Sequence, residues 1–215
     1  MYAICGIVLY YNLTQFMERQ QFKENVVLVD TDALDRTVAD FRLNFGSLLG
    51  REIPVADLAE WLVCVALDGG VPEDEKGESQ GEIQVVLIRS AAKTYLTEFN
   101  PGNMVFAIDG QAFRDPYLGE FLLSVVPEEK PTSVTEPLFV ESARYLLDCK
   151  EIKRLILVPD MQKYGEYLKE DMAKADRPDG VCLLTMQAED GRGFRSEILG
   201  YCLMHALGIQ PEELK

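Results

Sequence analysis

The stretch Val26-Val27-Leu28-Val29-Asp30 decides the fold, because it is a short, uninterrupted apolar run that ends in an aspartate. A strand that is buried on both faces needs apolar side chains on both sides, so apolar and polar residues do not alternate along it. The same pattern returns at Arg154-Leu155-Ile156-Leu157-Val158-Pro159-Asp160. Two strands of this kind indicate a parallel sheet that is covered on both faces.

Outward from these two runs, apolar segments alternate with stretches of helical spacing. The predicted strands of the sheet are 26–29, 83–88, 104–108, 154–158 and 180–184. The predicted helices are 37–49, 55–66, 91–98, 116–125, 138–149, 161–173 and 196–207. This alternation predicts a Rossmann-like, three-layer α/β/α fold with a mostly parallel sheet, formed by a single domain over residues 1–215. Residues 3–11 are predicted to form a further apolar strand, for which an antiparallel place at the sheet edge is one option.

The composition limits the partners and the compartment. The chain has 215 residues and a net charge of −15, so it repels nucleic acid and anionic membrane, and we expect no binding to RNA or DNA without a divalent metal. Five cysteines without a CxxC pair predict reduced thiols and a cytoplasmic location. The N-terminus lacks the basic region and cleavage site of a signal peptide. The single histidine, His205, lies in an apolar helical stretch and is expected to be a packed core or interface residue.

Aspartates follow three of the predicted strands, at Asp30, Asp109 and Asp160. Ligands of open parallel sheets bind beyond the carboxyl ends of the strands, where such side chains come together. Grouped carboxylates repel each other, and Mg²⁺ or Mn²⁺ relieves that repulsion with the oxygen ligands that these ions prefer. A simpler interpretation is that each aspartate caps the helix that follows it. The sequence leaves both interpretations open.

The run Val27-Leu28-Val29-Asp30-Thr31-Asp32-Ala33-Leu34 resembles the first unit of PIN and NYN ribonuclease-like domains, in which a strand ends in a metal-binding aspartate. Glu136, the helix around Glu141, the segment Leu155–Asp160 and Tyr164-Gly165 resemble their second unit. The resemblance covers about residues 25–187. It departs from the family at Ala33, where NYN domains have Asn, and at Val158–Lys163, which replaces a Ser-Gly-Asp-x-Asp-Phe run. An inactive relative therefore remains an alternative.

This resemblance implies a Mg²⁺ or Mn²⁺ site and phosphoester hydrolysis of the nuclease type. The implied metal ligands are Asp30, Asp32, Glu136 and Asp160. Of these, Asp30, Asp32 and Asp160 are the implied catalytic residues, with Asp109 or Glu141 as auxiliary groups.

A second resemblance is to haloacid-dehalogenase-type phosphatases. Asp30-Thr31-Asp32 matches their Asp-x-Asp motif, Ser90 ends a second strand, and Lys150 or Lys153 precedes the acidic segment at Asp160. Leu34 stands where that family has Thr.

Two functional hypotheses follow from the sequence. The first is a metal-dependent phosphoester hydrolase that uses the strand-end carboxylates. The second is a non-catalytic α/β module that binds a protein partner. The C-terminal helix carries an apolar stripe that faces either the core or a dimer interface, namely Ile198, Leu199, Cys202, Leu203, Ala206 and Leu207.

Overall fold

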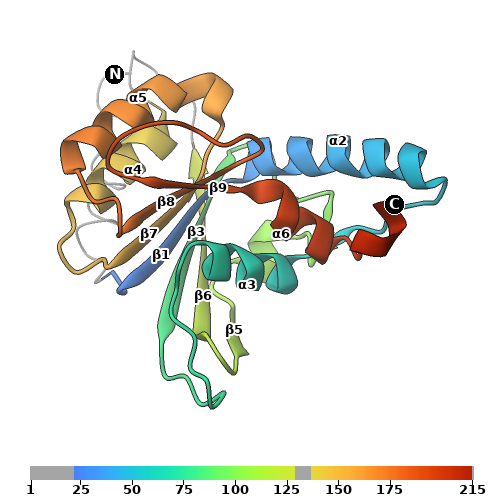
Figure 1. Cartoon of the computed structure of the whole chain (residues 1–215), viewed down its shortest axis with the longest axis horizontal. Coiled ribbons are helices and arrows are strands. Elements are labelled where there is room, and N and C mark those ends of the chain that lie inside the picture. Colours follow the sequence, from blue (N-terminus) through green and yellow to red (C-terminus); the bar gives the residue numbers. More distant parts are fainter. Residues whose placement is uncertain (1–21, 129–136, 215) are drawn as a thin grey trace, which may run out of the picture.

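The structure, a computed structural model, describes residues 22–128 and 137–214. Its main sheet has seven strands in the order β5-β6-β3-β1-β7-β8-β9 (Figure 1). Every neighbouring pair is parallel except β5 with β6. The strands are β1 (Asn25–Asp30), β3 (Glu82–Ser90), β5 (Ala112–Asp115), β6 (Gly119–Glu128), β7 (Arg154–Val158), β8 (Val181–Thr185) and β9 (Arg195–Ile198).

Helices cover both faces of this sheet, which confirms the predicted three-layer α/β fold (Figure 1). On one face lie α2 (Thr31–Leu49), α3 (Leu58–Asp68) and α6 (Leu199–Ala206), and on the other lie α4 (Leu138–Asp148) and α5 (Met161–Ala175). The central strand β1 serves both layers. Val27 and Val29 pack with the first group of helices, whereas Val26 and Leu28 pack with the second. Burial on both faces explains the uninterrupted apolar run of β1.

The strand order contains the doubly wound order 3-2-1-4-5-6, here β6-β3-β1-β7-β8-β9. The chain moves from β1 to β3 and β6 on one side, then crosses back to β7, β8 and β9 on the other side. The order therefore reverses between β1 and β7, which are direct neighbours. In such sheets ligands bind outside the carboxyl ends of the strands at this reversal. Asp30 ends β1, and Asp160 follows β7 by two residues.

Two predictions in the middle of the chain were wrong. Residues 104–108 are not a strand but one turn of π-helix, η1 (Met104–Ile108). Only Met104 and Ile108 are buried there, and the three residues between them are exposed, which is a helical pattern. Residues 116–125 are not a helix, because most of them belong to strand β6, in which buried and half-buried residues alternate at first. Its first residue, Gly119, has φ +106°, and a Cβ there would lie 2.1 Å from the Gly81 carbonyl oxygen, so the turn needs glycine.

Other boundaries also differ from the predicted ones. Residues 91–98 form turns instead of a helix, and they lead into β4 (Phe99–Asn100), which pairs with β2 (Ala56–Asp57) in a small second sheet. Helix α2 begins at Thr31 because Asp30 caps it, and residues 195–198 form β9 before α6 begins. A short 3₁₀-helix, η2 (Pro211–Leu214), follows. The predicted strand 3–11 and Glu136 lie outside the described residues.

Within the described parts of the chain, no helix combines the length and the apolar character that crossing a bilayer requires.

Candidate functional site

The two aspartates at the reversal point each cap a helix. Asp30 Oδ1 accepts a hydrogen bond of 2.9 Å from the backbone N–H of Ala33, at the start of α2. Asp160 Oδ1 accepts bonds of 3.1 and 3.2 Å from the N–H groups of Gln162 and Lys163, at the start of α5. The capping interpretation is therefore confirmed for both residues.

The second oxygen of each aspartate is bound by a side chain from the opposite helix. The Tyr164 hydroxyl of α5 donates to Asp30 Oδ2, and the Arg36 guanidinium of α2 lies 2.7 Å from Asp160 Oδ2. Asp30 and Asp160 are 7% and 8% exposed. We call these two contacts the crossed pair. It joins α2 to α5 above the carboxyl ends of β1 and β7.

A kink in α5 accompanies the Tyr164 contact. The backbone of Tyr164 leaves helical geometry at φ −142° and ψ 18°, and its ring stacks on Phe139 with centroids 5.2 Å apart. Burial, together with the negative charge of Asp30, raises the pKa of the Tyr164 hydroxyl far above its usual range. The hydroxyl therefore keeps its proton and remains a donor to Asp30.

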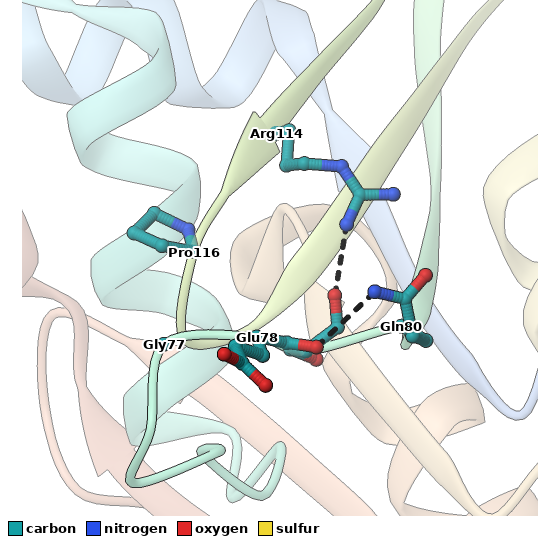
Figure 2. A pocket seen from close by; sticks show the side chains of 6 residues that line it. Gly77, Glu78, Gln80, Arg114 and Pro116 are labelled. Carbon is teal, nitrogen blue, oxygen red and sulfur yellow. Dashed lines mark hydrogen bonds between the residues drawn. The ribbon is translucent and has the colours of Figure 1, made fainter.

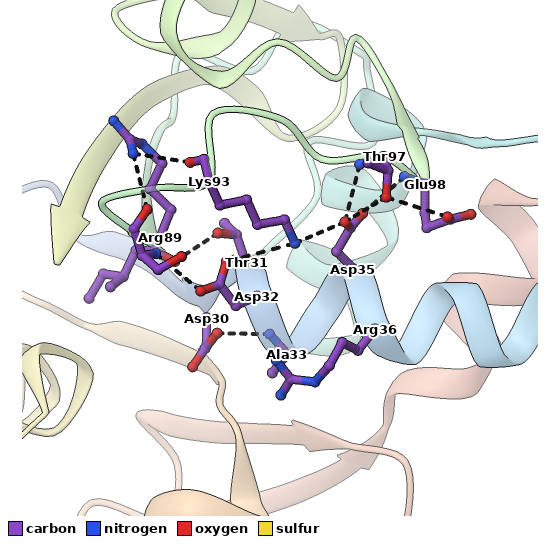
Figure 3. A network of polar contacts seen from close by, with 12 residues as sticks. Asp30, Thr31, Asp32, Ala33, Asp35, Arg36, Arg89, Lys93, Thr97 and Glu98 are labelled. Atoms are coloured by element: carbon purple, nitrogen blue, oxygen red, sulfur yellow. Dashed lines mark hydrogen bonds and ion pairs between the residues drawn. The ribbon is translucent and has the colours of Figure 1, made fainter.

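Asp32 and Asp35 have a different role, which Figure 3 shows. Asp32 Oδ2 accepts from the Ser90 N–H at 3.1 Å, and Asp35 accepts from Thr97 Oγ1 at 2.8 Å and from the Glu98 N–H at 2.9 Å. The Lys93 ammonium lies 2.8 Å from Asp35 Oδ2 and 3.7 Å from Asp32 Oδ1. These two acids, spaced i and i+3 on α2, therefore hold the segment 89–98 against the helix.

The electrostatics of Asp35 agree with this structural role. Burial by itself would raise the pKa of the Asp35 carboxyl, but Lys93 and the donors of Glu98 and Thr97 outweigh it, so that this pKa is lowered. A carboxylate with these partners is charged and fully engaged at neutral pH.

The remaining predicted site residues do not join this group. Asp109 ends η1 and accepts a hydrogen bond of 2.8 Å from the Val125 N–H of β6. Glu141 lies in the first turn of α4. Lys153 pairs with Glu24 at 2.7 Å, at the amino end of β7 and thus at the opposite end from Asp160. His205 is exposed on α6, so it is not a packed core residue, and its place in an interface stays a prediction.

Within residues 22–128 and 137–214, no three Asp, Glu, His or Cys side chains are grouped as a metal ion would require. Sequence reasoning missed Arg36, Lys93 and Asp35, and it named Tyr164 only within the PIN and NYN resemblance, not as a partner of Asp30. For Asp35, the spacing of one helical turn after Asp32 was a readable signal.

Two hollows lie on the surface of the described chain, of which one borders residues that bind the strand-end aspartates. One, of about 410 Å³, is lined by residues 161–167, Lys169 and Glu189. The other, of about 700 Å³, lies between the loop 77–80 and strand β5, where Arg114 donates to the Ser79 carbonyl oxygen at 2.8 Å (Figure 2). Neither is lined by Asp30, Asp32 or Asp160.

A group of thiols lies between α3, β8 and α6. The Cys202 thiol donates to Asp68 Oδ2 at 3.0 Å, and Cys182 lies 3.9 Å from the Asp68 carbonyl oxygen. Burial raises the pKa of the Cys182 thiol to about 11 and, together with Asp68, raises the pKa of Cys202 further. Cys64, Cys149, Cys182 and Cys202 are all free thiols, which are unreactive where they are buried and protonated.

The fold and this site define a doubly wound α/β protein in which the two strand-end aspartates at the reversal point are bound by donors of the same chain. The chain belongs to a family of unknown function, DUF6621, whose profile matches residues 19–214. No curated protein and no solved structure matches it.

Proposed function

We propose that this chain is a non-catalytic α/β module that acts by binding a protein partner, and that its strand-end aspartates serve the fold. The crossed pair carries the proposal. Both oxygens of Asp30 and of Asp160 already accept hydrogen bonds from protein donors. A divalent cation at Asp160 would have to displace the Arg36 guanidinium, which has the same sign of charge. The free thiols favour a reducing compartment, and we place the protein in the cytoplasm.

A metal-dependent phosphoester hydrolase of the nuclease-like kind is the second candidate. One observation favours it, because Asp30 and Asp160 end neighbouring strands at the reversal point, where doubly wound proteins bind ligands. Mg²⁺ or Mn²⁺ would then be held by Asp30, Asp32 and Asp160, with Glu136 as a further ligand. The ion would supply an activated water and stabilise the charge of a phosphoryl transition state.

Thermal and urea unfolding of Asp160 variants separates the two candidates. We expect Asp160→Ala to lower the free energy of unfolding by about 1 kcal/mol, because the α5 cap is lost. Asp160→Asn should stay within about 0.5 kcal/mol of the original, since Asn caps as well as Asp. Loss of the ion pair with Arg36 should change the free energy of unfolding little, because the Arg36 side chain is 58% exposed. Millimolar Mg²⁺ or Mn²⁺ should leave all three melting temperatures unchanged.

The hydrolase hypothesis predicts the opposite response to Asp160→Asn and to added metal. Carboxylates that share an empty metal site repel each other, so Asp160→Asn would stabilise the metal-free protein. Added Mn²⁺ would raise the melting temperature of the original chain much more than that of the variant. This pattern, together with Mn²⁺-dependent cleavage of bis(4-nitrophenyl) phosphate, would overturn the non-catalytic proposal.

A further inference from the structure

The connection between strands β8 and β9, which Figure 1 shows as a wide arch, is fastened to helix α5 at two points. The Lys169 ammonium of α5 lies 2.5 Å from Glu189 Oε2 of the connection. Further along the chain, both carboxylate oxygens of Asp176, at the end of α5, accept from the Arg192 guanidinium at 3.1 and 2.7 Å. These two points are about 10 Å apart along the helix axis. We call residues 186–193 the β8–β9 arch.

Little besides these two ion pairs holds the arch in place. Residues 186–192 contribute no buried side chain. Among the described residues, 187–193 make no backbone–backbone hydrogen bond, and the Glu189 N–H donates to the Ser196 hydroxyl at 2.9 Å. A segment with few buried apolar contacts and few internal hydrogen bonds opens at a low free energy. The arch can therefore move while the sheet stays folded.

The two ends of the arch are fixed. Thr185 ends β8 as a buried residue, and its hydroxyl donates to the Gln187 carbonyl oxygen at 2.6 Å. Phe194 is buried in the core that the sheet forms with α4 and α5. Just before it, Gly193 has φ +85°, and a Cβ there would lie 2.1 Å from the Met172 carbonyl oxygen of α5. Only glycine allows this approach, and its conformational freedom suits Gly193 as the hinge on the β9 side.

The arch closes one side of the hollow of about 410 Å³ at the start of α5. Glu189 contributes one wall of this hollow, and residues 161–167 and Lys169 contribute the rest. One of these residues is Tyr164, whose hydroxyl binds Asp30 in the crossed pair. Movement of Glu189 away from Lys169 would widen the hollow and bring solvent to the part of α5 that carries the crossed pair.

The backbone at the second ion pair indicates that this contact is specifically built. Asp176 has φ 49°, and it is the one non-glycine residue with a positive φ in the part of the chain that the structure describes. A side chain disfavours this conformation, which persists where the surrounding contacts require it. The Arg192 guanidinium also holds the pKa of the Asp176 carboxyl below its ordinary value. The pair is therefore fully charged at neutral pH.

We propose that the β8–β9 arch is a lid beside the hollow at the start of α5, and that the Lys169–Glu189 and Asp176–Arg192 ion pairs are the latches that keep it closed. The Arg192 and Asp176 side chains are 75% and 47% exposed. Exposed ion pairs are weak and are screened by salt. The lid therefore opens when salt or a competing charged group replaces a latch. This inference goes beyond the proposed partner binding and does not depend on it.

Limited trypsin digestion of the full chain, with fragments identified by mass spectrometry, tests the lid. Cleavage after Arg192 requires the arch to leave α5, because Asp176 holds the Arg192 side chain and Gly193 packs on the helix. Asp176→Asn and Glu189→Gln each remove one latch and keep every trypsin site. We expect each substitution to speed this cleavage about two- to fivefold, and the double variant to speed it about four- to twenty-five-fold. Cleavage after Arg36 in α2 reports unfolding of the whole chain and should not change.

Glu170→Gln is the matched control. It breaks the Glu170–Lys174 ion pair of 2.8 Å, which lies on the same helix and does not involve the arch. Cleavage after Arg192 should therefore proceed at the original rate in this variant. Raising NaCl from about 50 to about 500 mM should speed this cleavage about two- to fivefold in the original chain and leave the double variant unchanged. Rates are normalised to the cleavage of a small peptide substrate under the same conditions.

Three results would overturn the inference. The first is a double variant that is cleaved after Arg192 at the original rate, and the second is an equal acceleration in Glu170→Gln. The third is an acceleration that extends to Arg36, since the ion pairs would then support the whole fold and not a lid. Cleavage of the original chain after Arg192 as fast as after Lys76, in the exposed loop 72–81, would also overturn it, because the arch would already be open. The unfolding experiments on Asp160 variants are independent of all these outcomes.

Discussion

Raising the pH from about 7.5 to about 10.5 is expected to lower the free energy of unfolding by about 4 kcal/mol through Cys182 and Cys202 alone. Both thiols are almost fully buried, and both have a pKa raised above the ordinary value of 9.0, Cys182 to about 11 and Cys202 beyond it. Burial is the main cause in each case, and the Asp68 carboxylate adds to it at Cys202.

The direction follows from proton linkage. Below about pH 9 these thiols are protonated in both the folded and the unfolded chain, so folding carries no penalty. Between that pH and the raised pKa of the folded state, only the unfolded chain loses the thiol protons, and this loss stabilises the unfolded state. Each thiol then lowers the free energy of unfolding by about 2 kcal/mol at pH 10.5. Cys64, half-buried with a pKa of about 11, and Tyr164 act in the same direction.

Urea unfolding in reducing buffer measures this effect, with the fluorescence of Trp61, the single and fully buried tryptophan, as the probe. Cys202→Ala is the control. It should be less stable than the original chain at pH 7.5, because it leaves a small cavity. At pH 10.5 the gap should close by about 2 kcal/mol, since the variant has no thiol to titrate. A gap that stays constant with pH would contradict the assignment to Cys202.

Asp30→Ala is expected to lower the free energy of unfolding by about 2–4 kcal/mol. About 1 kcal/mol comes from the lost N-cap of α2. The rest comes from the Tyr164 hydroxyl, which is buried and would lose its acceptor. Tyr164→Phe should cost about 1.5–3 kcal/mol, because it leaves one oxygen of a buried carboxylate without its donor. The double variant should cost less than the sum of the single variants, by about 1–3 kcal/mol.

Asp57→Ala is the matched control for this experiment. Asp57 caps α3 by accepting from the Glu60 N–H at 2.9 Å, as Asp30 caps α2. No side chain of another helix is bound to it in the described part of the chain. Asp57→Ala should therefore lower the free energy of unfolding by about 1 kcal/mol and show no coupling to Tyr164→Phe. Equal costs for Asp30→Ala and Asp57→Ala, or additive behaviour of Asp30 and Tyr164, would contradict the crossed pair.

The sequence by itself determined the layered architecture. The apolar runs at 26–29, 83–88 and 154–158 can be buried along their whole length only in a sheet that is covered on both faces. The structure places all three in the parallel sheet. It also determined that Asp30 and Asp160 follow central strands and can cap helices. Local patterns failed where burial is decided by distant segments. The run 104–108 is apolar like a strand, yet three of its residues face solvent.

Only the tertiary structure decided what the carboxylates bind. Arg36 is 124 residues from Asp160, and Tyr164 is 134 residues from Asp30. No local period connects such positions, because their meeting depends on the strand order that places β1 beside β7. The same order places the first turns of α2 and α5 together, so that each helix supplies the donor for the cap of the other. In the sequence, a strand-end aspartate that binds a metal ion looks the same as one that binds an arginine. The two cases differ only in the folded chain, because the assembled sheet brings the partner within hydrogen-bonding distance.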